Sequence, residues 1–197
     1  MKKVLVSLLV LILLTLTGCF SNTMHGDVKY APFTESQVII YKDARYDSVD
    51  ELAFHIYTTE DDVELGYNDT FKGYRGFFSE TADNPKYIFV SRCVEDYAMA
   101  VYIRRDFDYK SKTLVLEGTD EKIIYSDAFT ETDEIVNGET IISFTNPVYL
   151  YFEDYPRLKI ELSVKKDGEK YYYMYGGEKQ KLSDELVDIL RRNNIIS

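Results

Sequence analysis

Few residues of this chain could act as a nucleophile or a general base. Its 197 residues include two histidines, His25 and His55, and two cysteines, Cys19 and Cys93. Nucleophilic catalysis needs a base, most often histidine, beside a serine or cysteine. The sequence around Cys93 and His55 is not typical of an enzyme nucleophile. We therefore predict no catalytic residue, and expect His55 to be a partly exposed surface residue and Cys93 a small buried one.

Acidic residues gather in two short clusters, at positions 60–64 and 131–134. Neither cluster has the spacing or the central glycine of an EF-hand, and charge runs of this kind are usually solvated loops. A structural zinc site would need four cysteine or histidine ligands. We predict no metal site and no cofactor. A weak calcium site and a pair of carboxylates of the glycosidase type stay open as alternatives.

Arg105 is the third feature with possible chemistry. It falls on the same side of a predicted strand as Val101 and Ile103, where a buried apolar side chain is expected. A strand that extends past its sheet, or a bulge that reverses the register, would account for this position. The alternative is that Arg105 lies in a polar pocket and binds an anion, which makes it our one speculative polar site.

The elements that must position these residues are mainly strands. From Phe33 on, apolar residues recur with a period of two, interrupted by turn residues. The clearest strand runs from 157 to 164 and is followed by Asp167-Gly168, a typical two-residue hairpin turn. That turn would place Tyr171 opposite Val164 on a buried face. The other predicted strands are 37–41, 86–91, 97–107, 113–117 and 121–126.

Two helices are expected beside the strands. Ser48 and Glu51 form a capping box in front of an apolar stripe that reaches Tyr57. Near the C-terminus, Ser183 caps a second helix with acidic residues in its first turn and arginines in its last. The predicted fold class is α+β, a mostly antiparallel β-sheet or sandwich with a short helix near each end.

The N-terminus has the form of an export signal. Lys2 and Lys3 precede an uncharged stretch from Val4 to Leu16. As a helix this stretch would span about 20 Å, too short for a hydrocarbon core of about 30 Å. Leu16-Thr17-Gly18-Cys19 follows directly.

Together with the preceding stretch, these four residues resemble the lipobox of bacterial lipoproteins. The resemblance implies that a lipid is attached to Cys19, and that the signal peptide is cleaved between Gly18 and Cys19. We therefore expect a signal peptide at 1–18, a lipidated cysteine and tether at 19–32, and a single β-rich extracytoplasmic domain at 33–197. The implied location is the outer face of the cell membrane, or the outer membrane in a diderm source.

Composition narrows the function classes further. The formal net charge is −11, and no long run of lysine or arginine is present to neutralise nucleic-acid phosphates or anionic lipid. Hydrophobic residues make up 45% of the chain, too many for a disordered protein. We predict a membrane-anchored lipoprotein that acts as a non-enzymatic binding or accessory domain with a protein partner at the cell envelope. The alternatives are a carboxylate-dependent hydrolase of cell-envelope polymers and a receptor for a small ligand or ion.

Overall fold

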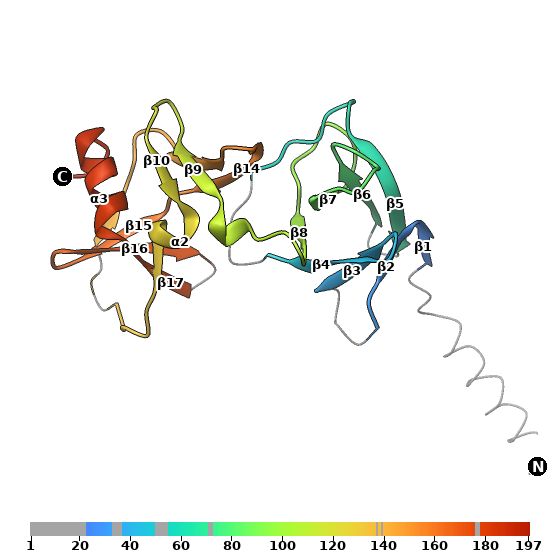
Figure 1. The fold of residues 1–197 in the computed structure, drawn as a ribbon, viewed down its shortest axis with the longest axis horizontal. Helices are drawn as coiled ribbons and strands as arrows, with labels where there is room; N and C mark the ends of the chain where they lie inside the picture. The colour runs from blue at the N-terminus through green and yellow to red at the C-terminus, as the bar shows by residue number, and fades with distance from the viewer. Residues whose placement is uncertain are drawn as a thin grey trace, which may run out of the picture.

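The computed structural model describes residues 23–32, 37–49, 55–70, 73–136, 138, 140–175 and 178–197. These residues form three antiparallel sheets in two lobes that lie side by side along the longest axis (Figure 1). The prediction of a mostly antiparallel β structure is confirmed. In this part of the chain no helix has the length and hydropathy needed to cross a membrane.

The N-terminal lobe is one eight-stranded sheet that nearly closes on itself. The strands at its two edges, β1 and β2, are separated in the chain by Asp27 alone, whose N–H donates to the carbonyl of Leu65 at 3.2 Å. Gly26 has a φ of 86°, and a Cβ there would lie 2.6 Å from the Cα of Gly66, so this approach of β1 to β5 requires glycine. The strands, in spatial order, are β1 (Thr23–Gly26), β5 (Val63–Thr70), β6 (Gly73–Ser79), β7 (Tyr87–Ser91), β8 (Ala100–Arg104), β4 (Ala44–Ser48), β3 (Val38–Tyr41) and β2 (Val28–Tyr30).

Strand β7 is buried along its whole length because its two faces contribute to two different cores. Ile88 and Val90 pack inside the nearly closed sheet. Tyr87 and Phe89, which alternate with them, belong to a second cluster that continues into the C-terminal lobe. A continuous apolar strand is what burial on both faces produces. This second cluster is therefore a hydrophobic core that both lobes share.

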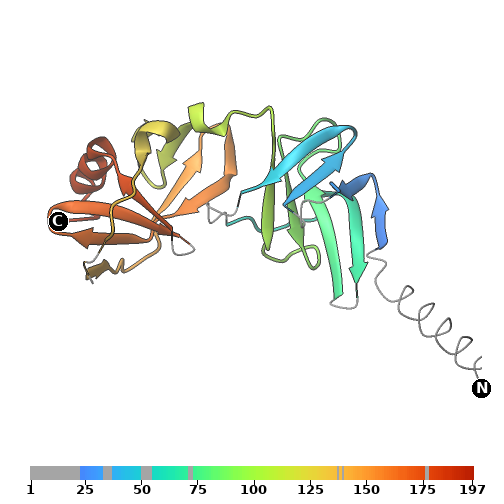
Figure 2. The same ribbon diagram turned by 90° about the horizontal axis from the view of Figure 1, so that it is seen from below.

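The C-terminal lobe contains two smaller sheets and the helices (Figure 2). One sheet has the order β10 (Lys122–Ile124), β9 (Thr113–Leu116), β13 (Tyr149–Phe152) and β14 (Tyr155–Glu161). The other has the order β11 (Phe129–Glu131), β17 (Glu178–Leu182), β16 (Lys170–Tyr175), β15 (Val164–Asp167) and β12 (Thr140–Ile142). The helical elements are the 3-10 helix η1 (Tyr109–Ser111), α2 (Tyr125–Ala128) and α3 (Asp184–Arg192).

Helix α3 forms as the sequence predicts. The hydroxyl of Ser183 accepts a hydrogen bond from the N–H of Leu186, which satisfies one of the free donors of the first turn. Acidic residues occupy the first turn and Arg191 and Arg192 the last, so both ends complement the helix dipole. The apolar side of α3 is buried in the core cluster shared by the two lobes.

The hairpin of β15 and β16 forms two positions away from the predicted register. Tyr173 lies opposite Val164, and Asp167 pairs with Lys170, so the turn residues are Gly168 and Glu169. A shift by an even number of residues leaves every side chain on its original face. Tyr171 and Tyr173 are therefore buried, as predicted.

Two expectations near the N-terminus are wrong in the described residues. The tether predicted for 19–32 contains β1 and β2, and Val28 is completely buried because β2 pairs with β3. Each of these strands is too short to show an apolar period. The helix predicted from Ser48 to Tyr57 is not formed at its two described ends, because Ser48 ends β4 opposite Tyr102 of β8 and Tyr57 forms a β-bridge with Tyr97. Residues 50–54, including Glu51, lie outside the described residues.

Candidate functional site

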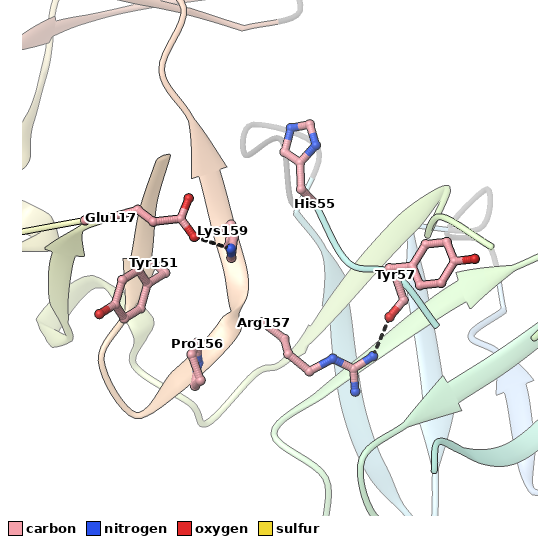
Figure 3. Close-up of a pocket in the computed structure, with 8 residues that line it drawn as sticks. His55, Tyr57, Glu117, Tyr151, Pro156, Arg157 and Lys159 are labelled. Carbon is pink, nitrogen blue, oxygen red and sulfur yellow. Dashed lines mark hydrogen bonds and ion pairs between the residues drawn. The ribbon is translucent and has the colours of Figure 1, made fainter. Parts of the chain in front are cut away.

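A groove of about 530 Å³ lies between the two lobes (Figure 3). Ligand sites in proteins commonly have this size and lie between structural units. One wall is the outer face of β13 and β14, where Lys159 lies opposite Tyr151 in the sheet register. The other wall is the segment before β5 that carries His55 and Tyr57. The lining residues are His55, Tyr57, Glu117, Gly118, Tyr151, Pro156, Arg157 and Lys159.

Alternation along β14 explains why its polar side chains face the groove. Leu158 and Ile160 are completely buried in the core. Successive side chains of a strand point to opposite faces, so Arg157, Lys159 and Glu161 lie on the other side. The sequence pattern of this strand therefore predicts a polar face, and the neighbouring lobe converts that face into one wall of a groove.

Arg157 connects the two lobes. Its Nη1 and Nη2 donate to Oδ1 and Oδ2 of Asp62 at 2.6 and 2.9 Å, and Nη2 also donates to the carbonyl of Tyr57 at 2.8 Å. The guanidinium lies over the ring of Phe89, 5.2 Å from its centroid. In Figure 3 it points away from Lys159 and toward Tyr57. Arg157 thus contacts β7 and the segment before β5 at once.

Asp62 is the buried partner of this pair. Its side chain is 1% exposed, while that of Arg157 is 27% exposed. Burial acts to raise the pKa of Asp62, but hydrogen bonds from Arg157 and from the N–H of Thr59 outweigh it and lower the pKa below its ordinary value. Asp62 therefore stays ionised, and the pair supports the groove rather than offering a free charge to a ligand.

Other polar side chains of the groove also contact one another. Lys159 donates to Glu117 at 2.5 Å, and Nε2 of His55 lies 2.9 Å from a carboxylate oxygen of Glu161. The ring of Tyr149 lies between these pairs, 5.2 Å from the His55 ring and 5.6 Å from the Lys159 ammonium. Burial, with Glu161 and Glu117 nearby, raises the pKa of Tyr149, so its phenol stays neutral. The groove is a polar surface with paired charges around aromatic rings.

Exposed apolar side chains continue this surface. Tyr57 and Tyr97 form an isolated β-bridge, and their rings meet edge to face at 5.2 Å. Their exposed fractions are 48% and 64%. Val94 and Met99, in the same loop as Tyr97, are exposed too. A group of exposed large apolar residues beside a groove is typical of an interaction surface.

Comparison with known proteins does not assign this groove. No protein-family model, no curated protein and no solved structure matches the chain. Any function of the groove has to follow from its own side chains.

The structure places Arg105 away from the groove. Strand β8 ends at Arg104, and Arg105 follows it at the surface. Its Nε and Nη2 donate to the two carboxylate oxygens of Asp47 at 2.8 and 2.5 Å. The more buried of the two arginines is Arg104, which donates to Asp106 and Asn84. The guanidinium of Arg105 is thus already occupied by a carboxylate of β4.

Cys93 is exposed, so the prediction of a buried cysteine is wrong. It lies in a surface loop after β7, where the chain leaves the core. His55 is half-buried in the groove, next to Tyr149.

The acidic clusters are not brought together into one site. Asp62 pairs with Arg157, while Glu134 of the second cluster accepts from Lys170 and from the hydroxyl of Tyr172. Among the described residues, no group of three histidine, cysteine or acidic side chains could hold a metal ion. Residues 16–19, which resemble a lipobox in the sequence, lie outside the described residues.

Sequence reasoning missed the pair of Arg157 and Asp62. Both residues were visible, one on a predicted strand and one in an acidic cluster. They are 95 residues apart, and no local pattern connects them.

Proposed function

We propose that this protein is a membrane-anchored extracytoplasmic lipoprotein whose lobes form a non-enzymatic binding module, with the groove between them as the site for a protein partner. The anchor is the lipid on Cys19 that the lipobox implies. The observation that carries the proposal is the groove itself, with exposed Tyr57 and Tyr97 at its edge. Tyrosines that combine a large apolar area with a hydroxyl are enriched at protein interfaces.

The paired charges of the groove also favour binding over catalysis. Glu117 and Glu161 each contact a cationic or protonatable partner, Lys159 and His55 respectively. A carboxylate that acts on a glycosidic bond has to be free to approach its substrate. Both of these carboxylates already contact neighbouring side chains. These contacts fix the orientation of the side chains in the groove, which favours binding of a partner to a preformed surface.

The test is capture of a partner from cells by the tagged, natively anchored protein after brief crosslinking. A double variant, Tyr57→Ala with Tyr97→Ala, should lose the crosslinked partner because the aromatic contact area is removed. The matched control is Ile141→Ala, which removes an exposed apolar side chain from β12, outside the groove. It should keep the partner.

Three results would contradict the proposal in different ways. Equal capture by the double variant and by Ile141→Ala would place the partner elsewhere on the surface. Turnover of an envelope polymer that Glu117→Gln abolishes would show the carboxylate-dependent hydrolase instead. Saturable binding of a small molecule or ion, without a crosslinked protein, would show a ligand receptor.

A further inference from the structure

A row of aromatic rings lies on the outer face of β1, β5 and β6, at the end of the N-terminal lobe where the described chain begins. The rings of His25 and Tyr67 are stacked with centroids 4.5 Å apart, and those of Tyr67 and Tyr74 with centroids 5.4 Å apart. His25 lies opposite Tyr67 in the sheet register, so neighbouring strands supply neighbouring rings. The hydroxyl of Tyr74 donates to Glu64. We call His25, Tyr67 and Tyr74 the aromatic row.

Gly76 of β6 lies opposite Tyr67 and makes room for this row. A Cβ at Gly76 would lie 3.1 Å from the ring of Tyr74 and 2.3 Å from the ring of Phe78. Because Gly76 has no side chain, the rings of Tyr74 and Phe78 can both lie over β6 at this position. The row is therefore built by the backbone of three strands and is not a chance grouping of loop side chains.

The chain length between this face and Cys19 is very short. Strand β1 begins at Thr23, four residues after Cys19. Four extended residues reach at most about 14 Å. Because β1 is itself part of the sheet, a lipid on Cys19 would hold the aromatic row close to the membrane surface. The N-terminal lobe could not move far from the membrane while the lipid is inserted.

We propose that the aromatic row rests on the outer surface of the membrane into which the Cys19 lipid inserts, with β1, β5 and β6 as the membrane-facing wall. This inference rests on the lipid anchor of the proposed function. Tyrosine is enriched at the level of lipid headgroups, where its ring is in an apolar region and its hydroxyl in water. Histidine has the same division between an apolar ring body and a polar tip.

The charges beside the aromatic row indicate which lipid headgroups it contacts. Asp69 and Glu64 lie on β5 beside the row, so anionic headgroups would be repelled. The contact is made by rings against zwitterionic lipid. The C-terminal lobe, with α3 at its far end, lies at the opposite end of the long axis from β1 in both views (Figures 1 and 2). The groove is thus not at the anchored end of the molecule.

The chain contains no tryptophan, which allows a direct test. The full-length protein is purified with its lipid and reconstituted into phosphatidylcholine vesicles whose acyl chains are brominated close to the headgroup. In Tyr74→Trp, the single tryptophan should lose most of its emission, because bromine quenches only at short range. Tyr67→Trp is a second reporter, expected to behave in the same way if Tyr74→Trp folds poorly.

Two exposed positions serve as matched controls. Arg45→Trp lies on β4, on another wall of the same lobe, and Tyr97→Trp lies beside the groove. Both should keep their emission. If Tyr74→Trp and Tyr67→Trp stay as bright as Arg45→Trp while the protein floats with the vesicles, docking of this wall is wrong and the anchor stands. If the protein neither floats nor carries the mass of a lipid on Cys19, the anchor itself is wrong.

Discussion

Two arginine–aspartate pairs, one between the lobes and one at the end of β8, have similar hydrogen-bond distances and very different surroundings. In each, two guanidinium nitrogens donate to two carboxylate oxygens at 2.5 to 2.9 Å. Asp62 and Arg157 are 1% and 27% exposed, whereas Asp47 and Arg105 are 39% and 55% exposed.

The comparison shows that distances alone do not rank the importance of an ion pair. A pair that water reaches gains little net free energy, because each charge is well solvated without its partner. A buried carboxylate has lost that solvation, so removal of its partner leaves an uncompensated charge. Loss of the pair between the lobes should therefore lower the free energy of unfolding strongly, and loss of the pair at β8 should lower it little.

The largest expected effect is that of Arg157→Ala. This change leaves Asp62 buried without its cation and removes the guanidinium from the ring of Phe89. We expect the free energy of unfolding to fall by about 3 kcal/mol, measured by urea denaturation. This value is at the lower end of the usual range, because Arg157 is still partly hydrated.

A double variant separates the two possible causes of that loss. Arg157→Met with Asp62→Leu removes both charges and keeps side-chain volume at the interface. It should be more stable than Arg157→Ala, since no buried charge is left unpaired. Equal destabilisation by both variants would mean that packing against Phe89, and not the unpaired carboxylate, is responsible.

Acid should weaken the same interface. The pKa of Asp62 is lower in the folded protein than in the unfolded chain, so the unfolded state binds the proton more tightly. The stability contributed by Asp62 is therefore complete above about pH 5, and is lost as the pH falls below roughly 4 toward the folded-state pKa. Unfolding curves at a series of pH values test this for wild type and Asp62→Asn. The variant should be less stable at neutral pH and should lose less stability on acidification; parallel pH profiles would exclude Asp62 as the responsible group.

The smallest expected effect is that of Arg105→Ala. Its side chain and that of Asp47 are both hydrated, so loss of the pair should leave the urea midpoint unchanged within error. If this variant is instead as destabilised as Arg157→Ala, the contrast between the two pairs is wrong. Arg105 also lines a surface pocket of about 290 Å³ together with Asp47 and Arg104. Anion binding by the intact protein that Arg105→Ala removes would support the polar-site interpretation of this residue.

Much of the C-terminal lobe was predictable because its signals are local. The cap at Ser183 and the charged turns of α3 are short-range features, and they predicted the helix correctly. The hairpin of β15 and β16 was predicted with the correct buried face, although its register differs by two residues. The expected helix start at Ser48 shows the limit of local signals, since Ser48 is paired with β8 as the last residue of β4.

Local sequence patterns were enough to predict that the described chain is mostly antiparallel sheet with a capped C-terminal helix, and that Tyr171 and Tyr173 are core residues. These properties depend on neighbours a few positions away, which periodicity and capping reveal. Three further features are seen in the folded molecule alone: β1 and β2 nearly close a sheet, Asp62 is buried against Arg157, and two lobes enclose a groove. Those contacts join residues far apart in the chain, and their strength depends on burial, which no local pattern contains.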